Sequence, residues 1–158
     1  MPEQPLSEAS AALSFDAFRS TVLTDYRLAM LSREASLLGR REVLGGKAKF
    51  GIFGDGKEVA QVAMAKFFQP GDFRSGYYRD QTFMLAAGLT TVRELFAQLY
   101  ADPDPAHEPA SSGRQMNAHF STPFLDEKGD WLPLAQLKNV SADSSPTAGQ
   151  MTRALGLA

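Results

Sequence analysis

Two stretches of the sequence gather residues that could bind an anion or move a proton. The first is "SGYYRDQTF" at residues 75–83, where Tyr78 and Arg79 stand side by side. Arginine holds phosphate groups through two parallel hydrogen bonds, and a neighbouring tyrosine adds a hydroxyl donor and an aromatic wall. At a helix start, backbone N–H groups would add to such an anion site. The structural alternative is that Tyr78 belongs to the core and Arg79 pairs with Asp80 or another surface acid.

The second stretch is "SSGRQMNAHFS" at residues 111–121, a glycine-containing loop that carries His119. Imidazole is the side chain whose ordinary pKa lies near neutrality, so His119 could act as a general acid or base. Its polar neighbours in the loop are Arg114, Gln115 and Asn117. The alternative is an incidental loop histidine without a catalytic role. The other histidine, His107, lies too far along the chain for a metal-ligand pair.

A third stretch, "GDGKEVA" at residues 54–60, suggests a phosphate or metal site. It lacks the G-x-x-x-x-G-K-[ST] pattern of a phosphate loop. Asp55 and Glu58 instead have the spacing of a capping box, in which each side chain satisfies a backbone N–H at a helix start. We therefore predict that Asp55 caps a helix.

The composition limits the kinds of protein to which these residues can belong. The chain has 158 residues, of which 44% are apolar and 22% charged, with a net charge of −2. These values predict one globular domain and argue against a nucleic-acid or polybasic membrane surface. The chain has no cysteine, which excludes disulfides and thiolate chemistry within it and fits a cytoplasmic protein. It shows no signal-peptide pattern and no run of the ~20 apolar residues that a membrane span needs.

The elements that position these stretches are predicted to be mainly helical. Residues 1–13 form a polar arm, and Ser14 can cap the long amphipathic helix that follows. That helix is expected to bend or break at Gly39 and to end at Gly45 and Gly46. Its apolar stripe consists of Phe15, Phe18, Val22, Tyr26, Ala29 and Met30.

Two further helices carry the same signals. One follows Asp55 and stops at Pro70, and its apolar face consists of Val59, Val62, Ala63 and Phe67. The other begins with a capping box of Thr91 and Glu94. Its apolar stripe consists of Val92, Leu95, Phe96 and Leu99. A proline-rich loop of a length typical of functional or disordered segments then covers residues 102–117.

The C-terminal part reads as a strand followed by a helix. "LKNVS" at residues 137–141 predicts a short strand, and "SSPTAGQMTRALGLA" at residues 144–158 predicts a strand-to-helix turn. Ser145 or Thr147 would cap the helix. Because the sequence stops at Ala158 within this helical pattern, we expect a longer protein.

The order of these pieces is more specific than any one of them. "GKEVAQVA", "YYRDQTFMLAAG", "ELFAQLY", "GRQMNAHFS" and "SSPTAGQMTRALGLA" follow one another from about residue 50 to the end. In this order they resemble the alpha part of the E1 component of 2-oxo acid dehydrogenase complexes, most nearly the branched-chain type. The resemblance implies an α/β thiamine-diphosphate-binding fold for the whole protein. Residues 14–158 would be the incomplete N-terminal part of that domain, mainly α-helical with loops and one or two short strands.

The resemblance also implies roles for individual residues. Tyr78 and Arg79 would contact the diphosphate of the cofactor. Ser145 and the backbone of Thr147 would line the aminopyrimidine pocket. His119 matches an active-site histidine that steadies charged intermediates or the lipoyl partner. A loop that holds a potassium ion is matched by Ser144, Pro146 and Gln150.

The chain departs from the family pattern at several positions. Asn117 stands where proline usually follows "GRQM", Thr147 replaces a larger apolar residue, and Gly149 replaces a threonine that would be a potassium ligand. In thiamine-diphosphate enzymes, a Gly-Asp-Gly segment with downstream asparagines binds Mg²⁺. No Asn-Asn pair follows residues 54–56, so the Mg²⁺ ligands are expected beyond Ala158.

The activity implied by the resemblance is oxidative decarboxylation of a 2-oxo acid, with a branched-chain substrate favoured. The acyl group would then pass to the lipoyl domain of an E2 component. The expected partners are an E1 beta part or subunit, lipoyl-E2 and the 2-oxo acid, in a homo- or hetero-oligomer. This stretch alone is expected to be inactive and to expose apolar surface that the rest of the fold covers. The alternatives are a pyruvate or acetoin dehydrogenase E1, or a non-catalytic helical binding module that grips a partner with its proline-rich loop.

Overall fold

A computed structural model describes residues 14–158 of the chain, so the predicted polar arm at residues 1–13 lies outside the described part. The elements, in chain order, are α1 (Phe15–Leu44), α2 (Glu58–Ala65), β1 (Phe73–Ser75), α3 (Gln81–Ala86), α4 (Val92–Leu99), a 3₁₀ turn (Leu134–Gln136), β2 (Asn139–Ser141) and α5 (Gly149–Leu157). The described chain is therefore mainly helical with two short strands, as the sequence predicts.

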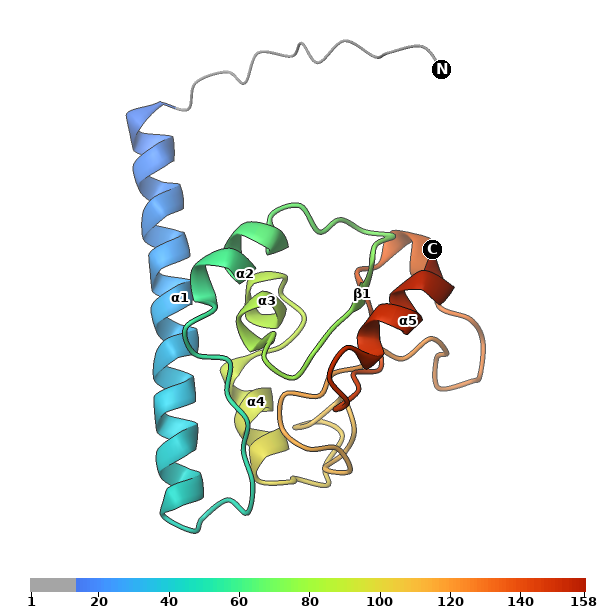
Figure 1. Ribbon diagram of the computed structural model, residues 1–158. Coiled ribbons are helices and arrows are strands. Elements are labelled where there is room, and N and C mark those ends of the chain that lie inside the picture. Colours follow the sequence, from blue (N-terminus) through green and yellow to red (C-terminus); the bar gives the residue numbers. More distant parts are fainter. Residues whose placement is uncertain (1–13) are drawn as a thin grey trace, which may run out of the picture.

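Helix α1 is a single long rod along one side of the molecule (Figure 1). Ser14 caps it as predicted, because its Oγ accepts a hydrogen bond from the N–H of Ala17 at 3.2 Å. The helix ends before Gly45, also as predicted. The expected bend or break at Gly39 is wrong, since the helix continues through this residue. Gly39 instead provides space, because a Cβ there would lie 2.3 Å from the ring of Phe53.

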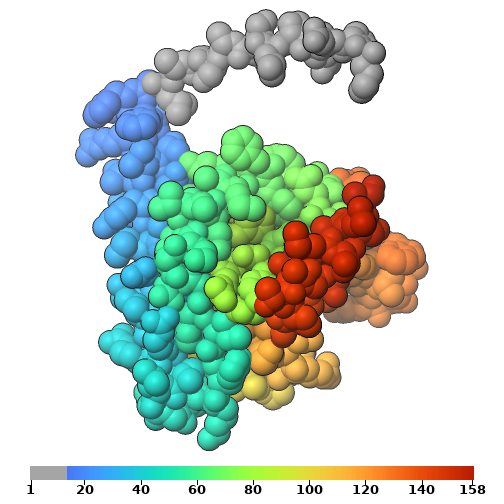
Figure 2. All heavy atoms as spheres, in the orientation of Figure 1, coloured from blue at the N-terminus to red at the C-terminus, as the bar shows by residue number. Residues whose placement is uncertain are grey.

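The apolar stripes predicted for α1 and α2 do not face the described core. Phe15 is 75% exposed and Phe67 is 82% exposed, whereas Val62 is the buried member of the α2 stripe. Small or polar residues form the buried side of α1: Ser32, Ala35, Ser36 and Gly39. Helix α1 lies at one side of the molecule (Figure 2). Many of its apolar side chains are therefore exposed on the surface of the described chain.

Helix α2 begins later than its predicted cap. Asp55 does not cap it, because its carboxylate pairs with Arg40 of α1 at 2.6 Å. The residue before the helix, Lys57, makes no capping bond with its side chain. Glu58 folds back instead, and its two carboxylate oxygens accept the N–H of Gly56 at 2.9 and 3.0 Å. A charged partner on a neighbouring helix thus replaces the local cap that the spacing predicted.

Strands β1 and β2 pair in parallel, with Phe73 opposite Asn139 and Ser75 opposite Ser141. β2 lies within the predicted "LKNVS" strand, whereas no strand was predicted at the position of β1. Helix α5 packs over β1. Because the two strands run in the same direction, the segments that follow them leave the sheet at the same edge.

The core lies between the helices and this strand pair. Its buried cluster consists of Ala65, Phe83, Met84, Leu95, Ala118, Phe120 and Val140. The capping box of α4 is confirmed: Thr91 Oγ1 accepts the N–H of Glu94 at 3.2 Å, and the Glu94 carboxylate accepts the N–H of Thr91 at 2.8 Å. Between residues 14 and 158, no helix has the length and apolarity needed to cross a membrane.

Candidate functional site

The turn after β1 brings two hydroxyls and a guanidinium together. The Tyr77 hydroxyl donates to the Tyr78 oxygen at 2.6 Å, and Nη2 of Arg79 donates to the same oxygen at 3.2 Å. These two bonds, that of Tyr77 first, lower the pKa of Tyr78 because they favour its phenolate form. Since the Tyr78 oxygen accepts twice, its own hydroxyl proton can be donated to a further group.

Arg79 is exposed, and within residues 14–158 no carboxylate lies at ion-pair distance from it. Asp80, the partner that the structural alternative named beside other surface acids, is bound elsewhere. Its Oδ2 accepts from Arg74 at 3.0 Å and from the N–H of Tyr77 at 2.9 Å. Most of the five N–H donors of the Arg79 guanidinium therefore remain for an anionic ligand.

The turn after β2 meets the turn after β1. Thr147 Oγ1 lies 3.2 Å from the Tyr77 hydroxyl. The parallel strand pair explains this contact, because Ser75 at the end of β1 lies opposite Ser141 at the end of β2. Open parallel sheets bind ligands outside the carboxyl ends of their strands, which is where both turns lie.

His119 completes the group from a third segment. Its Nε2 lies 2.8 Å from Ser145 Oγ, and its Nδ1 lies 3.2 Å from the carbonyl oxygen of Asn117. A carbonyl oxygen only accepts, so Nδ1 carries a proton, and in the neutral ring Nε2 accepts the Ser145 hydroxyl proton. The His119 and Tyr78 ring centroids are 6.2 Å apart, with an interplanar angle of 25°. The predicted residues that meet here are Tyr78, Arg79, His119, Ser145 and Thr147.

Two buried side chains hold the loop that carries His119. The carboxylate of Glu108, which is 1% exposed, accepts three backbone N–H groups and one hydroxyl from residues 110–113. Asn117 accepts the N–H of Ile52 at 2.9 Å and donates to the carbonyl of Ile52 at 2.8 Å. These bonds fix the loop at both ends. The asparagine that departs from the family pattern thus has a defined role that proline could not perform.

Of the residues predicted to hold potassium, Ser144 and Pro146 lie in the turn that leads into α5, and Gln150 lies in the first turn of that helix. Ser144 Oγ and Gln150 Oε1 are buried and have no hydrogen-bond partner among the residues that the structure describes. The Pro146 carbonyl accepts the N–H of Gly149 at 3.0 Å. Oxygen atoms such as these are the ligands that hard cations prefer. Residues 14–158 contain no cluster of three or more His, Cys, Asp or Glu side chains that could hold a metal.

The predicted helix cap in this turn is wrong. The residue before α5 is Ala148, which has a left-handed φ of 65° and makes no side-chain cap. Ser145 and Thr147, the two predicted caps, use their side chains on His119 and Tyr77 instead. Their hydroxyls therefore belong to the candidate site rather than to the helix start.

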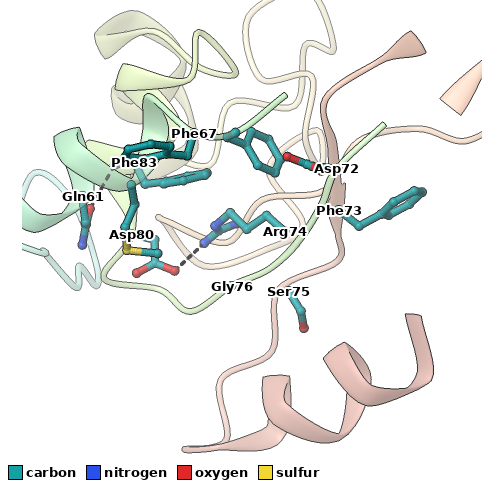
Figure 3. Close-up of a pocket in the computed structure, with 11 residues that line it drawn as sticks. Gln61, Phe67, Asp72, Phe73, Arg74, Ser75, Gly76, Asp80 and Phe83 are labelled. Carbon is teal, nitrogen blue, oxygen red and sulfur yellow. Dashed lines mark hydrogen bonds and ion pairs between the residues drawn. The ribbon is translucent and has the colours of Figure 1, made fainter. Parts of the chain in front are cut away.

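A buried ion network lies behind the site. Arg74, which is 7% exposed, contacts Asp80 on one side and Asp143 at 3.2 Å on the other. Burial raises the pKa of Asp143, and the Arg74 guanidinium opposes this shift. Arg74 also borders a cavity of about 480 Å³ whose walls include Phe67 and Phe83 (Figure 3).

Sequence reasoning missed three residues of this arrangement: Tyr77, Arg74 and Asp143. The doubled tyrosine was a signal for Tyr77. Arg74 and Asp143 are 69 positions apart, and no local pattern links them. The first glycine of "GDG" is explained by packing rather than by a helix cap. A Cβ at Gly54 would lie 2.2 Å from the Arg79 carbonyl oxygen, so the close approach of the two backbones requires glycine.

A comparison with protein families matches residues 26–130 to the model described as "Dehydrogenase E1 component". The chain belongs to the dehydrogenase E1 family. One relative of this E1 chain is the 2-oxoisovalerate dehydrogenase subunit alpha of Bacillus subtilis (strain 168), which is 34% identical over 139 residues. The match covers 84% of the chain but only 36% of the relative, so the chain spans about a third of that subunit's length. The resemblance to the E1 alpha part is thereby confirmed.

Proposed function

We propose that the complete protein is the E1 component of a 2-oxo acid dehydrogenase complex. It decarboxylates a 2-oxo acid on thiamine diphosphate and passes the acyl group to a lipoyl group on E2. A branched-chain 2-oxo acid is favoured because the relative is named for 2-oxoisovalerate. The observation that carries the proposal is the meeting of Tyr78 and Arg79 with His119, Ser145 and Thr147 at one sheet edge.

The chemistry of these side chains fits the cofactor. A diphosphate requires donors, and Arg79 together with the Tyr78 hydroxyl offers donors that the described chain does not consume. Ser145 and Thr147 are exposed in the turn that meets Tyr77, so Ser145 and the backbone of Thr147 would be available to line the aminopyrimidine pocket. When bound, thiamine diphosphate supplies the electron sink for decarboxylation, while the protein supplies position and electrostatics.

His119 is proposed as the catalytic side chain that steadies charge near the substrate or the lipoyl partner. His119 is 3% exposed, so the ring itself has little contact with solvent. Its Nε2 is linked to the exposed part of the site by the hydrogen bond to Ser145 Oγ. The fixed Nδ1–H keeps the ring in one orientation. A proton can therefore be held or moved along the line from Ser145 Oγ to Nε2.

Cations complete the proposed site. One arginine cannot neutralise a diphosphate in a partly buried cleft, so Mg²⁺ is required, with ligands outside residues 14–158. The unpartnered oxygens of Ser144 and Gln150, together with the Pro146 carbonyl, would hold K⁺. The domain assignment, a thiamine-diphosphate-binding fold that includes residues 14–158, is part of the same proposal.

The proposed partners follow from this activity. They are an E1 beta part or subunit, the lipoyl domain of E2 and the 2-oxo acid, in an oligomeric enzyme located in the cytoplasm. The beta part would cover apolar side chains such as Phe15 and Phe67. Release of CO₂ by the complete enzyme from branched-chain 2-oxo acids and from pyruvate decides between these two substrate classes. Acetoin has no carboxylate to lose, so it is tested by its cleavage to acetaldehyde in the presence of an electron acceptor.

Calorimetric titration of the complete enzyme with thiamine diphosphate and Mg²⁺ tests the proposed roles. Arg79→Ala should weaken cofactor binding by about tenfold or more, because it removes a charge-assisted contact. Arg93→Ala, an exposed arginine on α4, is the matched control and should bind as the parent does. His119→Ala should lower turnover and leave cofactor affinity nearly intact. Unchanged affinity in Arg79→Ala, or unchanged turnover in His119→Ala, would remove that residue from the site.

A further inference from the structure

We propose that Arg74 is a positioning residue for the candidate cofactor site, an inference that rests on the function proposed above. Its buried guanidinium joins three segments: the turn after β1, the loop that carries His119 and the turn after β2. In this arrangement the Arg74 guanidinium sets the distance between two turns. The turn after β1 would bind the diphosphate of the cofactor, and the turn after β2 would bind its aminopyrimidine. Arg74 acts through its neighbours and need not touch the cofactor.

The first set of contacts holds the turn after β1. Nη2 of Arg74 donates to the Tyr77 carbonyl at 3.2 Å and to Asp80 Oδ2 at 3.0 Å. The same Asp80 oxygen accepts the N–H of Tyr77 at 2.9 Å. The backbone that carries Tyr78 and Arg79 is therefore closed into a ring of hydrogen bonds around one guanidinium nitrogen.

The second set holds the other two segments. Nη1 of Arg74 donates to both carboxylate oxygens of Asp143 at 3.2 Å. Oδ2 of Asp143 accepts the N–H of Phe120 at 3.1 Å, and the N–H of Asp143 donates to the Phe120 carbonyl at 2.9 Å. Phe120 directly follows His119, and Asp143 directly precedes the turn that carries Ser145. One ion pair thus ties both loops to the first turn.

The neighbours of Arg74 leave space for its guanidinium and place aromatic rings near it. A Cβ at position 76 would lie 1.9 Å from the Arg74 guanidinium, so only glycine leaves the required space. The rings of Phe83 and Phe120 lie 5.8 and 6.0 Å from the guanidinium carbon. Figure 3 shows Arg74 reaching from β1 toward Asp80. Lysine would keep the charge but could not serve both carboxylates with a planar fork.

The physical case for positioning comes from the energetics of buried ion pairs. Replacing such a pair by apolar side chains of similar volume is often neutral for stability, whereas removing one partner is costly. The side chain of Asp143 is fully buried and that of Arg74 is 6% exposed. The network therefore contributes mainly geometry, and a variant that lacks both charges should fold while losing the alignment of the turns.

The first test uses the complete protein with Arg74→Lys. Since lysine cannot bind Asp80 and Asp143 with a planar fork, we expect the turns to shift and the dissociation constant for thiamine diphosphate to rise about tenfold or more. The circular dichroism of the variant should match that of the parent at the temperature of the titration. Lys47→Met, which breaks the exposed pair with Glu42, is the control and should leave affinity unchanged. A folded Arg74→Lys variant with parental affinity would overturn the proposal.

The second test is independent of cofactor binding. Crystal structures of the cofactor-free complete protein, as the parent and as Arg74→Met combined with Asp143→Leu, would show the contacts directly. We expect the variant to lose the Tyr77–Thr147 and His119–Ser145 contacts, which are 3.2 and 2.8 Å in the parent. Unchanged contacts in the variant would reject the positioning role.

The remaining outcomes are also decided by these variants. If the double variant does not fold, Asp80→Ala replaces it, since this side chain is 31% exposed and its removal takes away the oxygen that accepts from Arg74 and Tyr77. Parental contacts in a folded Asp80→Ala variant would then reject the role. If the parent itself binds no thiamine diphosphate, the proposed function fails while the crystal structures still decide the role of Arg74.

Discussion

The side chain of Asn117 connects the loop of His119 to the segment between α1 and α2, and its removal has a calculable cost. Asn117 is 6% exposed and makes two hydrogen bonds with the backbone of Ile52, at 2.9 and 2.8 Å. Asn117→Ala leaves the N–H and the carbonyl of a half-buried residue without partners. Each such group costs about 1–3 kcal/mol, and partial access of water to Ile52 favours the low end, so we expect about 2–4 kcal/mol of local stability to be lost.

Hydrogen exchange measured by mass spectrometry on the complete protein is the appropriate assay, because it reports local opening. A loss of about 2 kcal/mol corresponds to exchange that is about 30-fold faster at the Ile52 amide. Gln115→Ala, an exposed neighbour in the same loop, is the control and should change exchange there very little. If Asn117→Ala and Gln115→Ala exchange equally at residues 50–54, the two bonds do not hold the loop.

Two other predictions concern the turn after β1. Gly54→Ala should displace the backbone of Arg79, because a Cβ at position 54 would lie 2.2 Å from the Arg79 carbonyl oxygen. Crystal structures of the variant and the parent should show a shifted turn, and an unmoved turn would contradict the packing role of Gly54. Tyr77→Phe should raise the pKa of Tyr78, since the hydroxyl that favours the phenolate most strongly is lost. A nuclear magnetic resonance titration of the tyrosine ring carbons checks this shift, and a constant or lower pKa for Tyr78 would refute the assigned donor.

Several features of the fold could be predicted because their signals are local. Ser14 and the pair of Thr91 and Glu94 cap their helices through residues three positions away, so the spacing alone reveals them. The strand within "LKNVS" was also found. The ordered motifs indicated the E1 alpha part correctly, because an ordered set is far less frequent by chance than any single motif.

Two of the errors share a physical cause, which is a distant partner that outweighs a local one. Asp55 has capping-box spacing, but Arg40 on α1 provides a charged contact, and the cap is not made. The stripe on α1 has helical periodicity, yet the described core packs against the small residues on the other side, such as Ala35 and Gly39. Periodicity shows that a helix has an apolar face, and it does not show which other element of the folded protein covers that face.

The meeting of the two site turns depended on one short strand that sequence reasoning did not find. Phe73–Ser75 has only three residues and a charged residue at its centre, so it shows no run or alternation of apolar residues. Once it is paired in parallel with Asn139–Ser141, the position of the site follows from geometry, because both strands end at the same edge. The central residue that hides the strand is Arg74, and its partner Asp143 lies just beyond the end of the second strand. The side chain that obscures the strand in the sequence is thus the one that joins the two turns in the fold.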